Sequence, residues 1–255
     1  MERFAATTRT NVRRLIAGIR DDRQTLLAVV LIAVLAFSGW AFINIADEMS
    51  EGELDHIDHV LFLSLREPGN PQQLLGPPWL EEAALEITAL GGFPVIILLT
   101  TMVCGGLLAA RRPATSAFVA LSVAGGAALS TGLKMLFERP RPDLVKHLDI
   151  IHTASFPSGH ATISTLTYLT LAALIARVVT RRRVRVYLIA CALILAVMIG
   201  LSRIYLGVHW PSDVAAGWAL GTAWAALSFI VLAGIDILRR RRKPLPGDDA
   251  ESGPE

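Results

Sequence analysis

The segment "SRIYLGVHWPSD", residues 202–213, places a histidine four residues before an aspartate, with a proline between them. One helical turn separates His209 from Asp213, and Pro211 suits the first turn of a helix. This spacing lets the carboxylate hold one imidazole nitrogen and leaves the other nitrogen free for nucleophilic attack. A second histidine, His160, follows "FPSG" and could protonate a leaving oxygen as a general acid. The sequence therefore predicts a catalytic set of His209, Asp213 and His160.

Three cationic side chains stand at the ends of apolar runs, where burial is costly without an anionic partner. They are Lys134, Arg141 and Arg203. A phosphate is the expected partner, because the arginine fork binds its oxygens in pairs. Ser158 and Gly159 precede a predicted helix, whose free N–H groups and dipole favour an anion. We therefore expect a phosphate pocket formed by Lys134, Arg141, Ser158, Gly159 and Arg203.

The elements that position these residues are predicted from long apolar runs. The chain has 255 residues, of which 53% are hydrophobic and 18% charged, and its mean hydropathy is +0.51. A soluble domain is nearer to about 25% charged. Six runs are each long enough to cross a hydrocarbon core of ~30 Å; they lie at 26–46, 87–110, 114–137, 160–179, 186–206 and 214–238. We expect an all-α bundle of six transmembrane helices, forming one domain over residues 1–243 with a disordered polar tail at 244–255.

Most lysines and arginines lie before the first run, in alternate connections, and after the last run. By the positive-inside rule, these segments and both termini are predicted to be cytoplasmic. Three polar segments carry the candidate residues: 134–141, 158–160 and 202–213. They were not used for this orientation, yet all three then fall on the extracytoplasmic side of the plasma membrane. Their agreement supports a single site there.

The motifs Lys134-x6-Arg141-Pro142, Pro157-Ser158-Gly159-His160 and Ser202-Arg203-x5-His209-x3-Asp213 resemble the three-part signature of the type 2 phosphatidic acid phosphatase (PAP2) superfamily. The resemblance implies that His209 is a nucleophile that forms a phosphohistidine, that Asp213 is its partner and that His160 is the acid. It also implies that Lys134, Arg141, Ser158, Gly159 and Arg203 hold the phosphate, with no metal ion or other cofactor.

The resemblance further implies a substrate that is a membrane lipid phosphate or diphosphate. A polyprenyl diphosphate such as undecaprenyl diphosphate is the preferred substrate, and phosphatidic acid or phosphatidylglycerophosphate are the alternatives. An anion transporter built on the same cations is the alternative from a different class, although it would leave two histidines and an aspartate without a role. A vanadate-dependent haloperoxidase shares the motifs, but those relatives are soluble. No nucleic-acid signature is present, and the oligomeric state stays open.

Several other polar residues have a plainer interpretation. Asp55, His56, Asp58 and His59 could imitate a metal site, but the polar face of a helix lying at the interface is the favoured interpretation. We expect Arg139 and Lys146 to be solvated, and His147 and His152 to be loop residues. Cys104 and Cys191 lie in predicted helices as small core residues.

Overall fold

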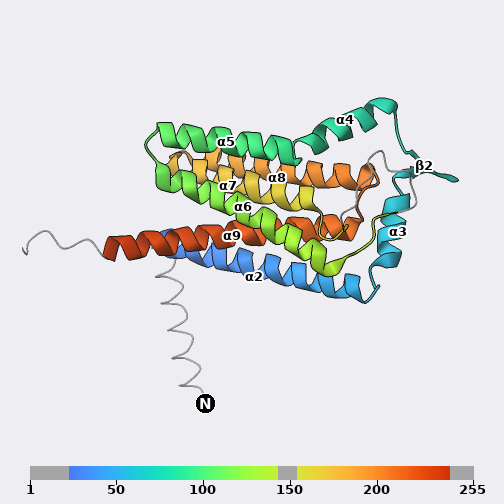
Figure 1. Cartoon of the computed structure of the whole chain (residues 1–255), viewed down its shortest axis with the longest axis horizontal. Helices are drawn as coiled ribbons and strands as arrows, with labels where there is room; N and C mark the ends of the chain where they lie inside the picture. Colours follow the sequence, from blue (N-terminus) through green and yellow to red (C-terminus); the bar gives the residue numbers. More distant parts are fainter. Residues whose placement is uncertain (1–22, 143–153, 242–255) are drawn as a thin grey trace, which may run out of the picture. The chain divides into compact units, whose positions relative to one another are not determined.

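A computed structural model of the protein describes residues 23–142 and 154–241. Within these residues it contains eight helices and one β-hairpin (Figure 1). The elements are α2 (Arg23–Ser50), α3 (Asp55–Leu63), β1 (Arg66–Glu67), β2 (Asn70–Leu74), α4 (Pro78–Ala89), α5 (Phe93–Ala109), α6 (Pro113–Phe137), α7 (Gly159–Val178), α8 (Arg182–Tyr205) and α9 (Pro211–Arg241). The chain divides into two compact units. One unit, residues 34–225, carries all the candidate site residues, and the described residues 23–33 and 226–241 belong to the other.

Five of the described helices are long and apolar enough to cross a membrane: α2, α6, α7, α8 and α9. The run predicted at 87–110 is instead broken into α4 and α5, which meet at an angle of 44°. The break contains Gly91 and Gly92, and Pro94 follows in the first turn of α5; these residues weaken a continuous helix. A Cβ added to Gly91 would lie 2.5 Å from Ile199 Cγ2, so α8 packs closely against the break. The described residues therefore contain five candidate spans, or six if the bent pair forms one, and the side on which the termini lie stays a prediction.

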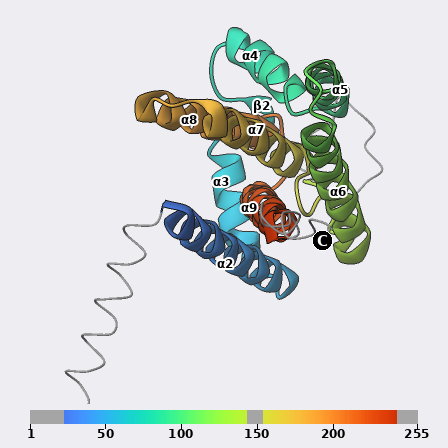
Figure 2. The same ribbon diagram turned by 90° about the vertical axis from the view of Figure 1, so that its left-hand side faces the viewer.

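Helix α7 is the most buried of the long helices within the larger unit, and it lies among α6, α8 and α9 (Figure 2). Two glycines of α9, four residues apart, allow this packing. A Cβ on Gly217 would lie 2.9 Å from the carbonyl oxygen of Ser158, and one on Gly221 would lie 2.6 Å from that of Thr162. Small residues let two helix backbones approach closely in a membrane. The start of α7 consequently lies against the first turn of α9, where the Ser158 N–H donates to the Asp213 backbone carbonyl at 2.9 Å.

Helix α3 runs across the ends of the longer helices, as expected for the polar segment around "DHIDH" (Figure 1). It is followed by a two-stranded antiparallel hairpin of β1 and β2, which the all-α prediction did not contain. The turn of this hairpin includes Gly69, whose φ of +84° lies in the left-handed region that glycine adopts readily. Apart from this hairpin, the regular structure of the described residues is helical.

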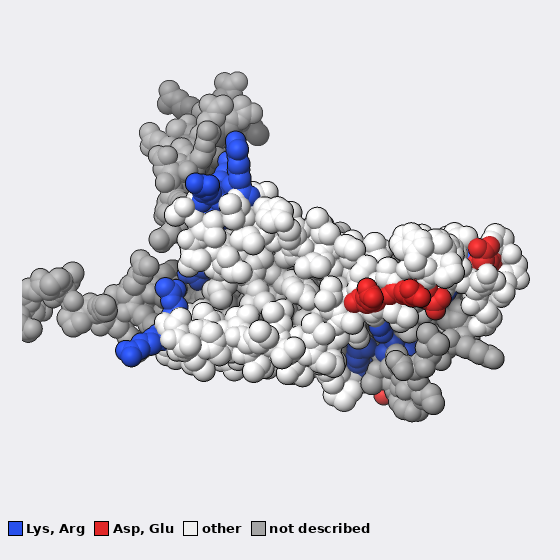
Figure 3. Space-filling model, turned by 90° about the horizontal axis from the view of Figure 1, so that it is seen from above, with Lys and Arg blue, Asp and Glu red and all other residues white. Residues whose placement is uncertain are grey.

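Basic side chains of the sequence pattern and of the candidate site lie at opposite ends of α6. Arg111 and Arg112 lie just before α6, whereas Lys134 lies in its last turn. At 1.5 Å per residue, the two ends of this 25-residue helix are more than ~30 Å apart. In Figure 3, acidic side chains gather toward one end of the visible face, beside a broad band without charged residues. The candidate residues therefore lie at the end of α6 opposite its preceding arginines.

Candidate active site

The structure brings the three polar segments together at one end of the helices. Lys134 lies in the last turn of α6 and Arg203 in the last turn of α8, while His160 lies in the first turn of α7. Arg141 follows α6, and His209 lies two residues before the start of α9. The charges of Arg203, His209, Lys134 and Arg141 all act on His160. Residues from four different helices and their connections thus surround one small region.

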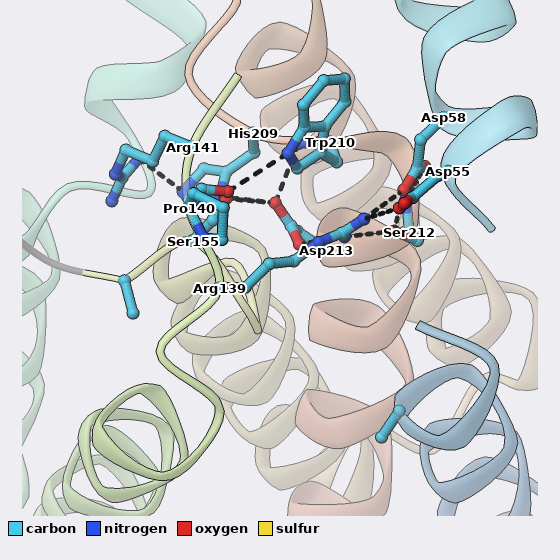
Figure 4. A network of polar contacts seen from close by, with 12 residues as sticks. Asp55, Asp58, Arg139, Pro140, Arg141, Ser155, His209, Trp210, Ser212 and Asp213 are labelled. Carbon is cyan, nitrogen blue, oxygen red and sulfur yellow. Dashed lines mark hydrogen bonds and ion pairs between the residues drawn. The ribbon is translucent and has the colours of Figure 1, made fainter. Parts of the chain in front are cut away.

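The imidazole of His209 is 1% exposed and is contacted on both nitrogens (Figure 4). Its Nε2 lies 3.3 Å from Arg141 Nη1. Because a guanidinium only donates hydrogen bonds, this Nε2 must act as the acceptor and be unprotonated. The proton of the neutral ring then lies on Nδ1, which is 3.3 Å from Ser155 Oγ and 3.4 Å from Asp213 Oδ2. The lone pair of Nε2 therefore points away from the carboxylate and toward the cations.

Asp213 is fully buried, and both of its carboxylate oxygens accept hydrogen bonds (Figure 4). Oδ2 accepts from the Trp210 N–H at 2.9 Å and from the Ser155 hydroxyl. The contact to Trp210 has a local origin, since a carboxylate in the first turn of a helix can reach back to the N–H of the residue that precedes the helix. Oδ1 accepts from Arg139 Nη1 at 2.8 Å. The sequence motif thus fixes one side of this carboxylate, and a more distant residue fixes the other.

Arg139 is buried rather than solvated, so the expectation for this residue was wrong. Its Nη1 donates to Ser212 Oγ at 2.7 Å as well as to Asp213, and its Nη2 donates to Asp58 Oδ2 at 2.8 Å. Glu138, which ends α6 with a φ of +48°, turns the chain so that Arg139 enters the interior. Burial lowers the pKa of Arg139, but the attraction of Asp213 and Asp58 outweighs it, and the net pKa lies above its ordinary value. Arg139 is therefore a permanent cation.

The remaining predicted phosphate ligands have defined partners. Lys134 Nζ donates to the Ala154 carbonyl at 2.8 Å and lies beside Gly159. Arg203 donates to Thr88 Oγ1 of α4 at 3.0 Å, and Arg141 donates to the Val208 carbonyl at 2.7 Å. Ser158 caps α7, because its hydroxyl accepts from the Ala161 N–H. Lys134, Ser158 and Gly159 therefore lie at the start of α7, and the charges of Lys134, Arg141 and Arg203 all act on His160 in its first turn.

Burial lowers the pKa of both groups that face each other before the start of α9, His209 and Arg141. It lowers the pKa of His209 from 6.5 to about 3, although Asp213 opposes the shift. Burial also lowers the pKa of Arg141 from its ordinary value, an effect that Asp213 again opposes. At neutral pH the imidazole of His209 is consequently uncharged, as a nitrogen nucleophile must be.

Ser155 is a functional candidate that sequence reasoning missed. It lies just before "FPSGH", outside the three motifs, and its hydroxyl contacts both His209 Nδ1 and the Asp213 carboxylate. Serine is common in loops, so its type and position gave no signal of this role.

The segment considered as a metal site has other partners. Asp58 Oδ2 accepts from Arg139, and Asp58 also accepts from the Ser212 N–H at 2.9 Å. The ring of His59 lies 4.8 Å from that of Trp210, and His56 is exposed. Among residues 23–142 and 154–241, no three His, Cys, Asp or Glu side chains gather closely enough to hold a metal ion. Lys146, His147 and His152 lie outside the described residues.

Comparison with known proteins assigns the family. A model of the PAP2 superfamily matches residues 115–235, a range that includes all three motifs. The chain is 32% identical over 177 residues to phosphatidylglycerophosphatase B of Bacillus subtilis, and the alignment covers 67% of this chain and 83% of that protein. The chain belongs to the PAP2 superfamily. The resemblance predicted from the three motifs is thereby confirmed.

A solved structure and one more curated protein are also similar to this chain. The crystal structure of a transmembrane PAP2-type phosphatidylglycerolphosphate phosphatase from Bacillus subtilis superposes with a TM-score of 0.69 at 25% identity, covering 84% of this chain and 98% of that one. An undecaprenyl-diphosphatase of Sulfolobus acidocaldarius is 40% identical over 74 residues, which are 29% of this chain and 32% of that protein. The protein is thus a multi-pass membrane phosphatase of the PAP2 superfamily. Asp58 and Ser155 lie outside the three motifs, and Arg139 occupies one of the unspecified positions between Lys134 and Arg141.

Proposed function

We propose that this PAP2 phosphatase cleaves lipid phosphates through a covalent phosphohistidine on His209. The contact between Arg141 Nη1 and His209 Nε2 carries the proposal. Because Arg141 can only donate, the contact identifies Nε2 as the unprotonated ring nitrogen, whose lone pair can attack phosphorus. The same arginine is suited to bind a phosphate oxygen. A phosphate held by Arg141 would therefore lie directly in front of the nucleophile.

The surrounding cations support a phosphate in this position. Lys134 experiences repulsion from both Arg141 and Arg203. Three like charges held together in a partly buried region favour an anion between them, and they stabilise the negative charge that a phosphoryl group carries in the transition state. The N-terminus of α7 at Gly159 adds backbone N–H groups directed at the same region.

The reaction is proposed to take place in two steps. In the first, Nε2 of His209 attacks phosphorus, the bond from phosphorus to the lipid oxygen breaks, and that oxygen takes a proton from His160. Asp213 and Ser155 hold the Nδ1 side of the ring, where the negative carboxylate stabilises the positive charge of the phosphorylated imidazole. In the second step, water attacks phosphorus and gives a proton to His160, while the P–N bond breaks. Inorganic phosphate leaves and His209 is restored.

We place the site at the extracytoplasmic face of the plasma membrane. Support comes from the arginines at the opposite ends of the helices, namely Arg111 and Arg112 before α6 and Arg181 to Arg183 at the start of α8. Such residues are enriched on the cytoplasmic side. The lipid tail would then remain among the helices while its phosphate enters the site from the outer surface.

The substrate proposed from the sequence is a polyprenyl diphosphate of the undecaprenyl type, and the Sulfolobus acidocaldarius relative carries that activity in its name. Phosphatidylglycerophosphate is an equally strong candidate. The Bacillus subtilis relative named for it aligns over a much larger share of this chain. Both substrates present a terminal phosphate on a lipid, which is the group that the proposed chemistry requires.

The test measures phosphate release from purified protein in detergent micelles with both lipids and with phosphatidic acid. The substrate with the highest kcat/KM identifies the preferred lipid. His209→Ala should abolish turnover and the acid-labile label left by a ³²P-phosphorylated lipid, while His160→Ala should slow the formation of this label. The exposed His56 provides a matched control, since His56→Ala should retain activity. Turnover by the His209→Ala protein would refute the nucleophile.

A further inference from the structure

A buried cluster beside the proposed nucleophile joins the motif residue Asp213 to Arg139 and Asp58, neither of which the PAP2 motifs specify. Arg139 lies at its centre, 9% exposed, between the carboxylates of Asp58 and Asp213, which are 2% and 0% exposed (Figure 4). Each of these carboxylates lies 2.8 Å from a different terminal nitrogen of the guanidinium. Asp55 also faces Arg139, at 3.6 Å, but it is 63% exposed. Arg139 therefore balances the charge of two buried acidic groups at once.

The geometry gives Arg139 a directional effect on Asp213. It donates to Oδ1, whereas the Ser155 hydroxyl and the Trp210 N–H bind Oδ2, the oxygen that faces His209 Nδ1. A carboxylate held at both oxygens cannot rotate about its Cβ–Cγ bond. Arg139 thus fixes which oxygen faces the histidine without touching the phosphate side of the ring.

Asp58 holds Arg139 and also the start of α9. Besides accepting from Nη2, it accepts from the N–H of Ser212 at 2.9 Å and from the Ser212 hydroxyl. Ser212 in turn accepts from Arg139 Nη1 at 2.7 Å. A residue of α3, 154 positions away in sequence, is therefore bonded to the residue directly before Asp213. Helix α3 is thereby part of the scaffold of the site.

We propose that Arg139 and Asp58 are positioning residues for catalysis: Asp58 orients Arg139, and Arg139 orients the Asp213 carboxylate that holds His209. This inference rests on the roles proposed above for His209 and Asp213. It assigns a catalytic contribution to helix α3, which lies outside the family match at residues 115–235. Arg139 acts on the nucleophile only through Asp213, whereas Arg141 contacts the nucleophilic nitrogen itself.

The test is a double-mutant cycle between Arg139→Lys and Asp213→Asn. Lysine keeps the charge but lacks the two-pronged donor geometry. Arg139→Lys alone should lower kcat roughly 10- to 100-fold, the effect of one charge-assisted hydrogen bond, with KM and the vanadate inhibition constant almost unchanged. In the Asp213→Asn background, assayed at higher enzyme concentration, the same change should lower kcat less than about threefold, because residues that act through one another are not additive.

Two variants complete the design. Asp58→Asn retains the shape and one acceptor oxygen of the side chain, so it should lower kcat by a smaller factor, and that factor should decrease in the Arg139→Lys background. Arg66→Lys is the matched control, since Arg66 is 5% exposed and packs on Phe62 at 4.7 Å. It should leave kcat within about threefold of the parent protein, which separates the proposed role from the general effect of removing a buried guanidinium.

Three results would overturn the inference. Equal loss of kcat on Arg139→Lys with and without Asp213 would show a purely structural role. A large rise in KM at constant kcat would show that Arg139 binds substrate directly, and unchanged activity would show that it has no role. Turnover by His209→Ala is a different result, because it refutes the proposed function and this inference falls with it. If only the cycle fails, the phosphohistidine proposal stands.

Discussion

The protonation state of His209 can be followed by changing the pH, because burial lowers the pKa of its imidazole from 6.5 to about 3. A histidine with its ordinary pKa would be only about 3% neutral at pH 5, whereas His209 should be about 99% neutral there. Between pH 6.5 and the lower pKa, the unfolded chain binds a proton that the folded protein does not. Stability contributed by His209 is therefore present above pH 6.5 and lost as the pH falls, by up to about 2 kcal/mol at pH 5.

The assay is ¹⁵N NMR of histidine-labelled protein in detergent micelles, without substrate, between about pH 8 and pH 4.5. The signal that disappears in His209→Asn identifies His209, and it should show one neutral tautomer with the proton on Nδ1 throughout. Thermal unfolding over the same range should show a steeper loss of stability toward acid in the parent than in His209→Asn. A midpoint for His209 near 6.5, or a proton found on Nε2 in the neutral state, would refute the assignment of the nucleophilic nitrogen.

Three further predictions concern packing, the Ser155 hydroxyl and metal dependence. Gly217→Val should lower the free energy of unfolding by about 1–3 kcal/mol through overpacking against α7, because its Cβ would lie 2.8 Å from Ala161 Cβ. The same variant should release phosphate more slowly. Gly105→Val is the control: the space around Gly105 is open, so this variant should behave like the parent protein in thermal unfolding and turnover. Ser155→Ala should lower kcat roughly 10- to 100-fold by removing a donor to the Asp213 carboxylate, and unchanged steady-state kinetics would show that the hydroxyl is dispensable. Phosphate release should persist in excess EDTA, because Lys134, Arg141 and Arg203 already supply positive charge; restoration of a lost activity by added divalent metal would contradict this.

Sequence reasoning found the groups expected to face the substrate because their types and spacings are local. His209 and Asp213 lie one helical turn apart, and Arg141 stands at a fixed distance from Lys134, so the motifs can be read without a structure. The long apolar runs likewise predicted the positions of five helices to within a few residues. The run at 87–110 is not one straight helix, because Gly91 and Gly92 interrupt it where α8 approaches.

The supporting groups could not be predicted in the same way. Arg139 is bonded to residues 74 and 81 positions away, and nothing in "RPRP" shows which arginine turns inward. The left-handed conformation of Glu138 decides this locally, and it is unusual for a residue other than glycine. Asp58 looked like one polar residue among several on a helix with two histidines, and only tertiary packing distinguishes it from the exposed Asp55.

The two arginines of "RPRP" enclose the His209–Asp213 pair from opposite ends. Arg141 contacts Nε2 of His209 at 3.3 Å, and Arg139 contacts Oδ1 of Asp213 at 2.8 Å (Figure 4). When His209 becomes phosphorylated, its imidazole becomes cationic and requires the negative charge of Asp213, for which Arg139 competes. Asp58 reduces this competition, because it balances the charge of Arg139 without weakening its hold on Oδ1. This argument gives Asp58 an electrostatic role beyond orientation, so Asp58→Asn should destabilise the phosphohistidine more than the free enzyme.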